Sequence, residues 1–295
     1  MSKDETEVTH KKLAELIEQV NNSEISSIKQ IIIHLITVIN DPDSSAKDLK
    51  DIIEKDPPLS ARLLKIANSV YYGFRRKISK IQDAIIGIGF DAVKELALSQ
   101  KVCELFNKND SIDGYSRLGL WENSIAVALC SKLVYMREFR DPGEKIYIAG
   151  LLHNIGIIIE DQFMQNQFKE TLVDSQTNKC NLMQSEKNIF GFDHADIGRA
   201  LTDNWEFPRE LVVSIGLHHT PELSDARYGR IVRTLFISDY ICQKNDIGYK
   251  DASYGNKRQY YQCLASLNIQ EEAIDLIMED VLIEIDKMKK SGWLL

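Results

Sequence analysis

The chain has 295 residues, of which 44% are hydrophobic and 27% are charged, and its formal net charge is −8. A chain of this length can hold one large domain or two packed lobes, each with a hydrophobic core. Its basic residues are scattered rather than gathered into a concentrated field, which argues against duplex DNA or RNA as the main partner.

The cysteines and the apolar runs exclude two further classes of protein. The five cysteines lie far apart without a CxxC motif, a spacing typical of neither a zinc knuckle nor a disulfide framework. The N-terminus lacks the apolar stretch of a signal peptide, and the longest aliphatic runs, 31–33 and 155–159, are too short to cross a bilayer. We therefore expect a cytoplasmic protein that makes no membrane contact.

Helical signals recur along the chain, whereas period-two alternation over the length of a strand is hard to find. Ser45 with Asp48, and Ser79 with Gln82, have the spacing of helix capping boxes. Asp56 precedes a proline that suits the first turn of a helix. These patterns predict an all-α fold.

Apolar spacing and caps place the individual helices. After Asp56, one apolar stripe is formed by Leu59, Leu63, Ile66, Ala67 and Val70. Gly191 resembles a helix C-cap, and Asp193 is expected to cap the next helix. Further helices are expected at about 28–40, 46–54, 82–87, 91–106, 117–136, 144–153, 182–190, 194–204, 208–219, 228–243 and 271–289.

The order of helices and polar segments predicts four parts. We expect an N-terminal extension over 1–24, a smaller N-terminal helical lobe over 25–115, a second helical lobe over 116–245, and a C-terminal loop and helix over 246–295. A polar stretch at 107–114 ends the first lobe, and the tail begins with a polar loop at 250–261.

Aromatic and basic residues are interleaved in the segment 71–80, YYGFRRKISK. Aromatic rings can stack on a base while arginine forks a phosphate, so Arg75, Arg76 and Lys77 are candidates for contact with a ligand or an acidic partner. We favour the simpler interpretation, a solvated loop whose aromatic side chains pack inward.

Four histidines and one aspartate of the second lobe are candidates for a divalent-metal site. His153 follows an apolar helix, His194 opens a helix, and the pair His218 and His219 ends another. Asp239 falls on the apolar face of its predicted helix, where a carboxylate needs a partner. Histidines and a carboxylate brought together from four helices can bind a divalent cation.

A structural role explains the same residues. His153, Asn154 and Asp239 can form a hydrogen-bonded network between helices, because asparagine supplies both donors and acceptors. Taken singly, a histidine at a helix end is more often a cap or a satisfied core group. The residues alone leave both interpretations open.

Six segments, in order along the chain, resemble the HDOD family, the HD-related output domain of bacterial signalling proteins. They are DPPLSARLLKIANSVYYG (56–73), ISKIQDAIIGIGFDAVKELAL (78–98), LWENSIAVA (120–128), GLLHNIG (150–156), FDHADIGRALTDNWEFP (192–208) and IGLHHTPE (215–222). The resemblance covers about residues 25–240 and implies a multi-helix, HD-domain-like bundle with a smaller N-terminal helical lobe. The second lobe of the family is similar to HD phosphohydrolases, which cleave phosphate esters, and to HD-GYP phosphodiesterases, which cleave cyclic di-GMP.

Active HD enzymes hold metal with an early histidine, an adjacent His-Asp pair, later histidines and a late aspartate. By this resemblance, Asn123 stands where the early histidine belongs, and Asn154 replaces the aspartate of the pair. The matching positions that keep a metal ligand are His153, His194, His218 or His219, and Asp239. A neutral amide coordinates weakly and cannot bridge two cations, so the resemblance does not imply a working two-metal centre here.

The sequence therefore predicts a non-catalytic regulatory protein that acts through protein contacts. Its degenerate cleft is expected to hold a ligand or a single divalent ion, with Fe, Mn, Ni, Zn and Mg as candidates. The expected partners are signalling proteins of two-component or cyclic-nucleotide pathways, because no sensor or output domain is expected on this chain. The alternative is a divergent metal-dependent phosphohydrolase or phosphodiesterase that uses the surviving ligands.

Overall fold

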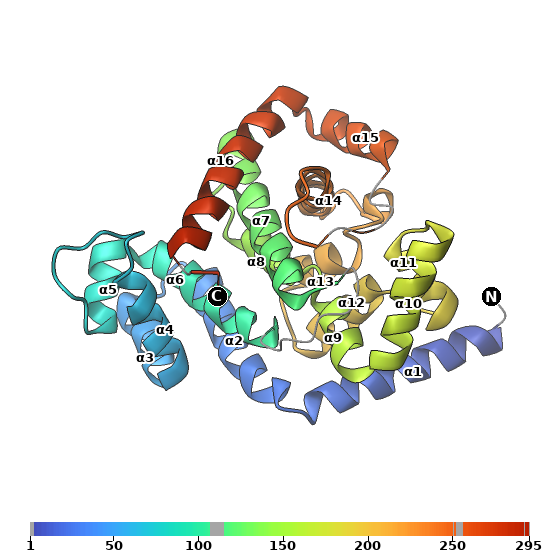
Figure 1. Ribbon diagram of the computed structural model, residues 1–295, viewed down its shortest axis with the longest axis horizontal. Helices are drawn as coiled ribbons and strands as arrows, with labels where there is room; N and C mark the ends of the chain where they lie inside the picture. The colour runs from blue at the N-terminus through green and yellow to red at the C-terminus, as the bar shows by residue number, and fades with distance from the viewer. Residues whose placement is uncertain (1–2, 107–114, 250, 252–255, 292, 295) are drawn as a thin grey trace. The chain divides into compact units, whose positions relative to one another are not determined.

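A computed structural model describes residues 3–106, 115–249, 251, 256–291 and 293–294, with side chains from residue 8 onward. Every regular element in these residues is helical and none of them forms a strand, which confirms the predicted all-α fold (Figure 1). No helix in the described ranges combines the length and the apolar character needed to cross a membrane. The residues group into two compact units, 1–26 with 106–278 (the larger unit) and 27–105 with 279–295 (the smaller unit). The four-part division at residues 24, 115 and 245 stays a prediction.

The smaller unit is built on short capped helices. Its helices are α2 (Ile25–Asn40), which begins at the end of the larger unit's first segment, α3 (Ala46–Glu54), α4 (Pro57–Ala67), α5 (Ile81–Ile88) and α6 (Phe90–Cys103). The capping box at the start of α3 is confirmed, since the side chains of Ser45 and Asp48 each bond the other's backbone N–H. Asp56 caps α4 by accepting a hydrogen bond from the backbone of Leu59 at 3.1 Å.

Two expectations for the smaller unit are wrong. Ser79 does not cap α5, because that helix starts one residue later, with Lys80 at the N-cap and no side-chain cap. The apolar stripe of α4 ends at Ala67, and Val70 beyond it is 94% exposed. The helix ends after about three turns, before a fourth could return Val70 to the core.

The larger unit carries all the candidate metal ligands. Its elements are α1 (Lys3–Asn21), α7 (Arg117–Val134), the π-helix η2 (Tyr135–Phe139), α8 (Glu144–Leu152), α9 (Ile155–Phe163), α10 (Gln165–Asn178), α11 (Leu182–Ile189), α12 (His194–Asn204), α13 (Arg209–Gly216), the 3₁₀-helix η3 (Pro221–Leu223), α14 (Gly229–Lys244) and α15 (Lys257–Leu267). The division between the two units falls within a 3₁₀-helix, η1 (Glu104–Phe106). Helix α16 (Glu271–Ser291) begins in the larger unit and ends in the smaller. Helices α7, α8, α13 and α14 pack together, and α12 contacts both α9 and α13.

Four of these helices were not expected from the sequence: α1, α9, α10 and α15. The start of α15 falls in the stretch assigned to a polar loop; Asn256 caps it by accepting from the backbone of Arg258 at 3.0 Å. Tyr260 and Cys263 are buried, which supplies the packing that stabilises so short a helix. Residues 250 and 252–255 of that loop lie outside the described residues.

A close contact at Gly156 sets the positions of the starts of α9 and α12. A β-carbon added to Gly156, in the first turn of α9, would lie 2.0 Å from the carbonyl oxygen of His194. The start of α9 therefore packs against the start of α12 at backbone distance. Only glycine permits this contact.

Candidate functional site

The larger unit brings the predicted ligands together from four helices. His153 is the C-cap of α8, His194 is the first residue of α12, and Asp239 lies within α14. His218 and His219 were expected inside a helix, but α13 ends at Gly216 and the pair occupies the turn that follows. Apart from the partly exposed His219, these side chains are buried.

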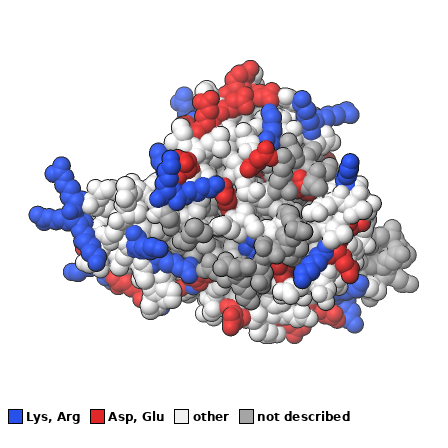
Figure 2. Space-filling model, viewed as in Figure 1, with Lys and Arg blue, Asp and Glu red and all other residues white. Residues whose placement is uncertain are grey.

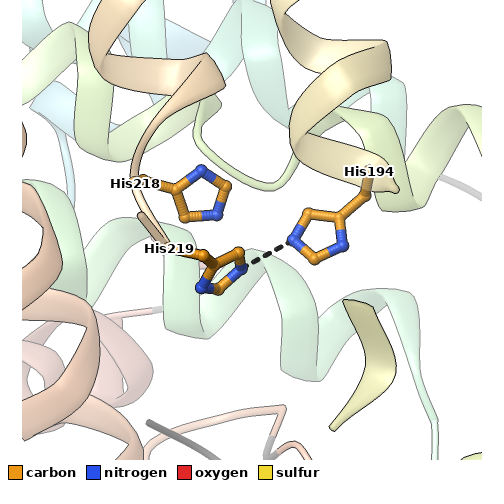
Figure 3. A group of neighbouring side chains, drawn as sticks. All are labelled: His194, His218 and His219. Atoms are coloured by element: carbon orange, nitrogen blue, oxygen red, sulfur yellow. Dashed lines mark hydrogen bonds between the residues drawn. The ribbon is translucent and has the colours of Figure 1, made fainter. Parts of the chain in front are cut away.

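Three of the histidines form a compact cluster, hereafter the histidine cluster: His194, His218 and His219 (Figure 3). Their nearest ligand nitrogens all lie within 4.8 Å of one another. The Nε2 atoms of His194 and His219 are 2.8 Å apart and share a hydrogen bond, the dashed line in Figure 3. The rings of His218 and His219 have centroids 3.9 Å apart.

His153 and His218 have the same hydrogen-bonding arrangement. Each directs Nδ1 at a backbone carbonyl three residues earlier, Gly150 at 2.7 Å and Ile215 at 2.6 Å. In both rings Nδ1 therefore carries a proton and donates, and Nε2 is the atom turned toward the site. Both Nε2 atoms are buried and have no hydrogen-bond partner among the described residues. A backbone acceptor that fixes the tautomer in this way is the usual support of a metal-binding histidine.

His194 differs, because a buried carboxylate holds it. The carboxylate of Glu186 lies 2.7 Å from its Nδ1 and also accepts from its backbone N–H at 2.9 Å. Burial lowers the pKa of His194, but the attraction of Glu186 outweighs burial and raises the pKa to about 9. At neutral pH His194 is thus an imidazolium that donates to Glu186 and to His219.

A second buried carboxyl group adjoins this pair. Burial, and then the charge of Glu186, raises the pKa of Glu160 well above its ordinary value. Neither oxygen of Glu160 receives a hydrogen bond from the described residues. The order of contacts is Glu160, Glu186, His194, His219.

Asp239 faces His153 and is anchored along its own helix. Its Oδ1 lies 3.6 Å from Nε2 of His153, and the side-chain amide of Gln243 donates to it at 2.9 Å. Burial raises the pKa of Asp239, but His153, His219 and Gln243 together lower it below its ordinary value. Asp239 is therefore an anion in the buried interior.

The two asparagines at ligand positions bond to each other. The side-chain amide of Asn154 donates to Oδ1 of Asn123 at 3.3 Å, and the amide of Asn123 donates to the carbonyl of Ile247 at 3.4 Å. The backbone at Gly248 presses against the same part of α7, because a β-carbon there would lie 2.7 Å from the backbone nitrogen of Asn123. Position 123 is thus both uncharged and covered by backbone.

Three imidazoles of the histidine cluster lie close enough together to share one divalent cation. His153 and Asp239 adjoin them, with the rings of His153 and His218 5.2 Å apart and Nε2 of His153 3.6 Å from Oδ1 of Asp239. Imidazole and carboxylate ligands suit Fe, Mn, Ni or Zn better than Mg. A second cation would need an anionic bridge, and the amide at position 154 cannot provide one.

A pocket of about 230 Å³ opens beside these ligands, with His219 and Asp239 in its wall. Phe236 and Tyr240 add ring faces, and Asp251 adds a second carboxylate. No lysine or arginine is among the described residues that line it. The entrance to the site is thus polar and anionic.

Sequence reasoning missed Glu186, Glu160 and Gln243. Gln243 could have been found, since it lies four residues after Asp239 on one helix face. Nothing in the sequence signals the contact of Glu186 with His194, because the glutamate lies on the preceding helix and the turn between them sets the distance.

The segment 71–80 belongs to the smaller unit and differs from the expectation. Its aromatic side chains are only partly buried: Tyr71 is 36% and Phe74 is 37% exposed, and Tyr72 is half-buried. Arg75, Arg76 and Lys77 are also exposed, and no described carboxylate pairs with them. Basic side chains project where the connection between α4 and α5 lies, at the left edge of Figures 1 and 2. The turn at Gly73 leaves partly exposed rings and exposed cations together at the surface.

Comparison with known proteins agrees with the fold. A family model of the HDOD domain matches residues 25–221, about two thirds of the sequence, and the chain belongs to the HDOD family. An uncharacterised protein of Treponema pallidum is 24% identical over 241 residues, which are 77% of this chain and 43% of that protein. The chain thus spans less than half the length of this relative.

Solved structures with the same fold come from three bacteria. An HDOD domain protein of unknown function from Geobacter sulfurreducens is 26% identical, with 88% of this chain and 90% of that chain covered and a TM-score of 0.76. A Marinobacter aquaeolei protein provisionally assigned to signal transduction is 22% identical, with 90% and 58% covered and a TM-score of 0.75. A Shewanella amazonensis protein provisionally described as a phosphohydrolase is 21% identical, with 96% and 98% covered and a TM-score of 0.70.

Proposed function

We propose that this HDOD protein is a non-catalytic regulator whose HD-like cleft holds a small ligand or one divalent ion. The observation that carries the proposal is the bond between Asn154 and Asn123, 3.3 Å long, at two positions where active HD enzymes place metal ligands. The NH2 group of each asparagine donates a hydrogen bond within the protein. The pocket therefore lacks the bridging anion and the additional imidazole of a hydrolytic two-metal centre.

The charge of the pocket supports the same proposal. A phosphate ester entering beside Asp239 and Asp251 meets two carboxylates and no lysine or arginine among the lining residues described. Such a substrate needs cations to offset the repulsion. The volume of about 230 Å³ also lies below the roughly 300–1,000 Å³ of pockets that enclose drug-sized ligands.

A single bound cation would fit the histidine cluster, beside His153 and Asp239. It would act as a Lewis acid and lower the pKa of a bound water. The protein's own contribution is to fix the two imidazole tautomers through Gly150 and Ile215 and to exclude water from the buried nitrogens. In a regulator, occupancy of this site stabilises one arrangement of α8, α13 and α14.

We assign partner contact to the exposed 71–80 segment. Its unpaired cations, Arg75, Arg76 and Lys77, lie beside exposed rings and suit an acidic protein surface. Signalling proteins of two-component or cyclic-nucleotide pathways are the proposed partners. The net charge of −8 keeps nucleic acid a poor candidate.

One observation favours a divergent phosphohydrolase as the second candidate. His153 and His218 keep the orientation of metal ligands, with Nε2 unpartnered, which a purely structural network does not require. In that case the surviving histidines and Asp239 would hold a working cation.

Turnover measurements separate the two candidates. Purified protein is assayed with generic phosphate esters and with cyclic di-GMP in the presence of Mn²⁺, Fe²⁺, Ni²⁺ or Mg²⁺, beside His153→Ala and the exposed control His34→Ala. We expect no hydrolysis above the buffer rate in any of the three. Hydrolysis that His153→Ala abolishes and His34→Ala preserves would establish the phosphohydrolase and overturn the regulator.

A further inference from the structure

A second and larger cleft lies where three helices of the larger unit begin. Its volume is about 710 Å³, and its walls include the first turns of α8, α13 and α14 together with Tyr135 of η2. None of its lining residues belongs to the histidine cluster. The metal-ligand candidates lie after the ends of α8 and α13 and ten residues along α14, so the two sites are separate.

Basic side chains slightly outnumber acidic ones in the lining of this cleft. Lys145, Arg209, Arg227 and Arg230 line it, together with the acidic residues Asp141, Glu144 and Glu210. Lys145 pairs with Glu210 at 2.6 Å, and Arg209 pairs with Asp203, outside the cleft, at 3.2 Å. Two guanidinium groups of the cleft take no part in these pairs. Arg227 lies just before α14, and Arg230 lies in its first turn.

Arg227 and Arg230 are oriented but not neutralised. The guanidinium of Arg227 lies 5.2 Å from the ring centre of Tyr228, and that of Arg230 lies 4.9 Å from the ring centre of Phe139. No described carboxylate pairs with either. A guanidinium held by its face against a ring keeps its N–H edge for another acceptor, and that edge matches phosphate.

Three helix N-termini border the cleft. None of their N-caps, Gly143, Pro208 and Tyr228, provides a side-chain cap. The helix dipoles place positive potential at the cleft, and Glu144 and Glu210 offset part of it. The π-helix that carries Tyr135 and Phe139 also borders the cleft, and such irregular turns are frequent at functional sites.

We propose that this cleft binds a small organic phosphate of nucleotide size, with the phosphate held by Arg227 and Arg230. The volume falls within the range of pockets that enclose drug-sized ligands, and an inorganic ion would leave most of it unfilled. Tyr135 and Tyr228 supply ring surface for the organic part. This binding does not depend on the state of the histidine cluster.

Calorimetric titration of the full chain tests the proposal with AMP, GMP, ATP, GTP and inorganic phosphate as probes. We expect at least one nucleotide to bind, more tightly than inorganic phosphate. The double variant Arg227→Gln/Arg230→Gln should lose about 10-fold or more in affinity, because two charge-assisted contacts are removed. Both side chains are exposed, so the variant should fold, and circular dichroism checks this.

Two controls localise the binding. Lys47→Gln/Lys55→Gln makes the same change of charge at two exposed residues of the smaller unit and should leave the affinity unchanged. His153→Ala should also leave it unchanged, which separates this result from any failure of the regulatory proposal. No nucleotide binding at millimolar concentration, equal affinity for inorganic phosphate, or full binding by the Arg227/Arg230 variant would overturn the proposal.

Discussion

Asn154 and Asn123 are joined by a side-chain hydrogen bond of 3.3 Å, and both are buried. The bond links the turn between α8 and α9 to the middle of α7, and Asn123 continues it to the carbonyl of Ile247. Asn123 and Asn154 thus form one structural unit. Changing either residue alone breaks a contact of the other.

Restoring the aspartate alone should therefore destabilise the protein. In Asn154→Asp, a buried carboxylate replaces the donor and faces the Oδ1 atom of Asn123, at a cost of about 1–3 kcal/mol in the free energy of unfolding. Urea denaturation at neutral pH measures this change. Asn188→Asp is the matched control, since Asn188 is exposed and already acts as an acceptor, from Gln184. A variant as stable as the parent would show that the amide pair is not a structural unit.

The protein should lose stability as the pH rises from about 7 to 9.5. The pKa of His194 is raised to about 9 from an unfolded value of 6.5, so its contribution is complete below pH 6.5 and lost as the pH rises through 9. The raised pKa of Glu160 acts in the same direction. His194 alone accounts for an effect of the order of 3 kcal/mol.

Glu186→Gln identifies the source of this pH dependence. It removes the charge that raises both pKa values, so the decline of the unfolding free energy above pH 7 should largely disappear. His34→Gln, at an exposed histidine, should keep the decline of the parent. An unchanged alkaline slope in Glu186→Gln would contradict the assigned pairing.

The free energy of unfolding should also fall as the pH drops below about 6.5. Burial, and then the neighbouring imidazoles, hold the pKa values of His218 and His219 well below their ordinary value. Both remain neutral in the folded protein while the unfolded chain takes up protons below about pH 6.5, so the folded state loses stability there. The same denaturation series shows this as a decline below pH 6.5. A His218→Gln variant should reduce that decline.

Metal analysis should find no more than one divalent ion per chain. We expect His218→Ala to weaken binding of Mn²⁺ or Zn²⁺ by about 10–100-fold or more, because an orphaned Nε2 donor is lost. If His194 also ligates, affinity should increase between about pH 7 and 9, since its imidazolium must first lose a proton. Two ions per chain by mass spectrometry of metal-loaded protein would contradict the mononuclear assignment.

Gly156→Ala should disrupt the site, although Gly156 is not itself a candidate ligand. The added β-carbon would lie 2.0 Å from the carbonyl oxygen of His194, so the helix starts must separate, at a cost of about 1–3 kcal/mol or more. Thermal denaturation and Zn²⁺ titration should both show the loss. In the control Gly229→Ala, the nearest atom is the mobile Nη1 of Arg233 at 2.7 Å, and a small effect is expected.

Local signals predicted much of the fold, and tertiary contacts decided the rest. The capping residues Ser45 and Asp193 were readable because a cap depends on neighbours three residues away. Ser79 with Gln82 has equally suitable spacing and fails, because packing of Ile81 and Ala84 sets where α5 starts. The same limit explains α9, whose continuous apolar run lacks the periodicity that marks a half-exposed helix.

In the candidate site, too, local patterns predicted some features and tertiary contacts determined the others. Asp239 was placed correctly on a buried helix face, because apolar spacing reports burial. The contact between Asn154 and Asn123 could not be foreseen, since it joins residues 31 positions apart through the crossing of α7 and α8. The exposure of Phe74 was likewise invisible, because aromatic side chains usually pack inward.

The lack of space at Gly156 has an evolutionary consequence. Every substitution there adds at least a β-carbon against the backbone of His194. Selection for folding therefore keeps glycine at this position, whatever chemistry the imidazoles perform. The helix starts keep their alignment even in a descendant that has exchanged its histidines for other residues. Such a lineage could regain the ligands by single codon changes and find their orientation already in place.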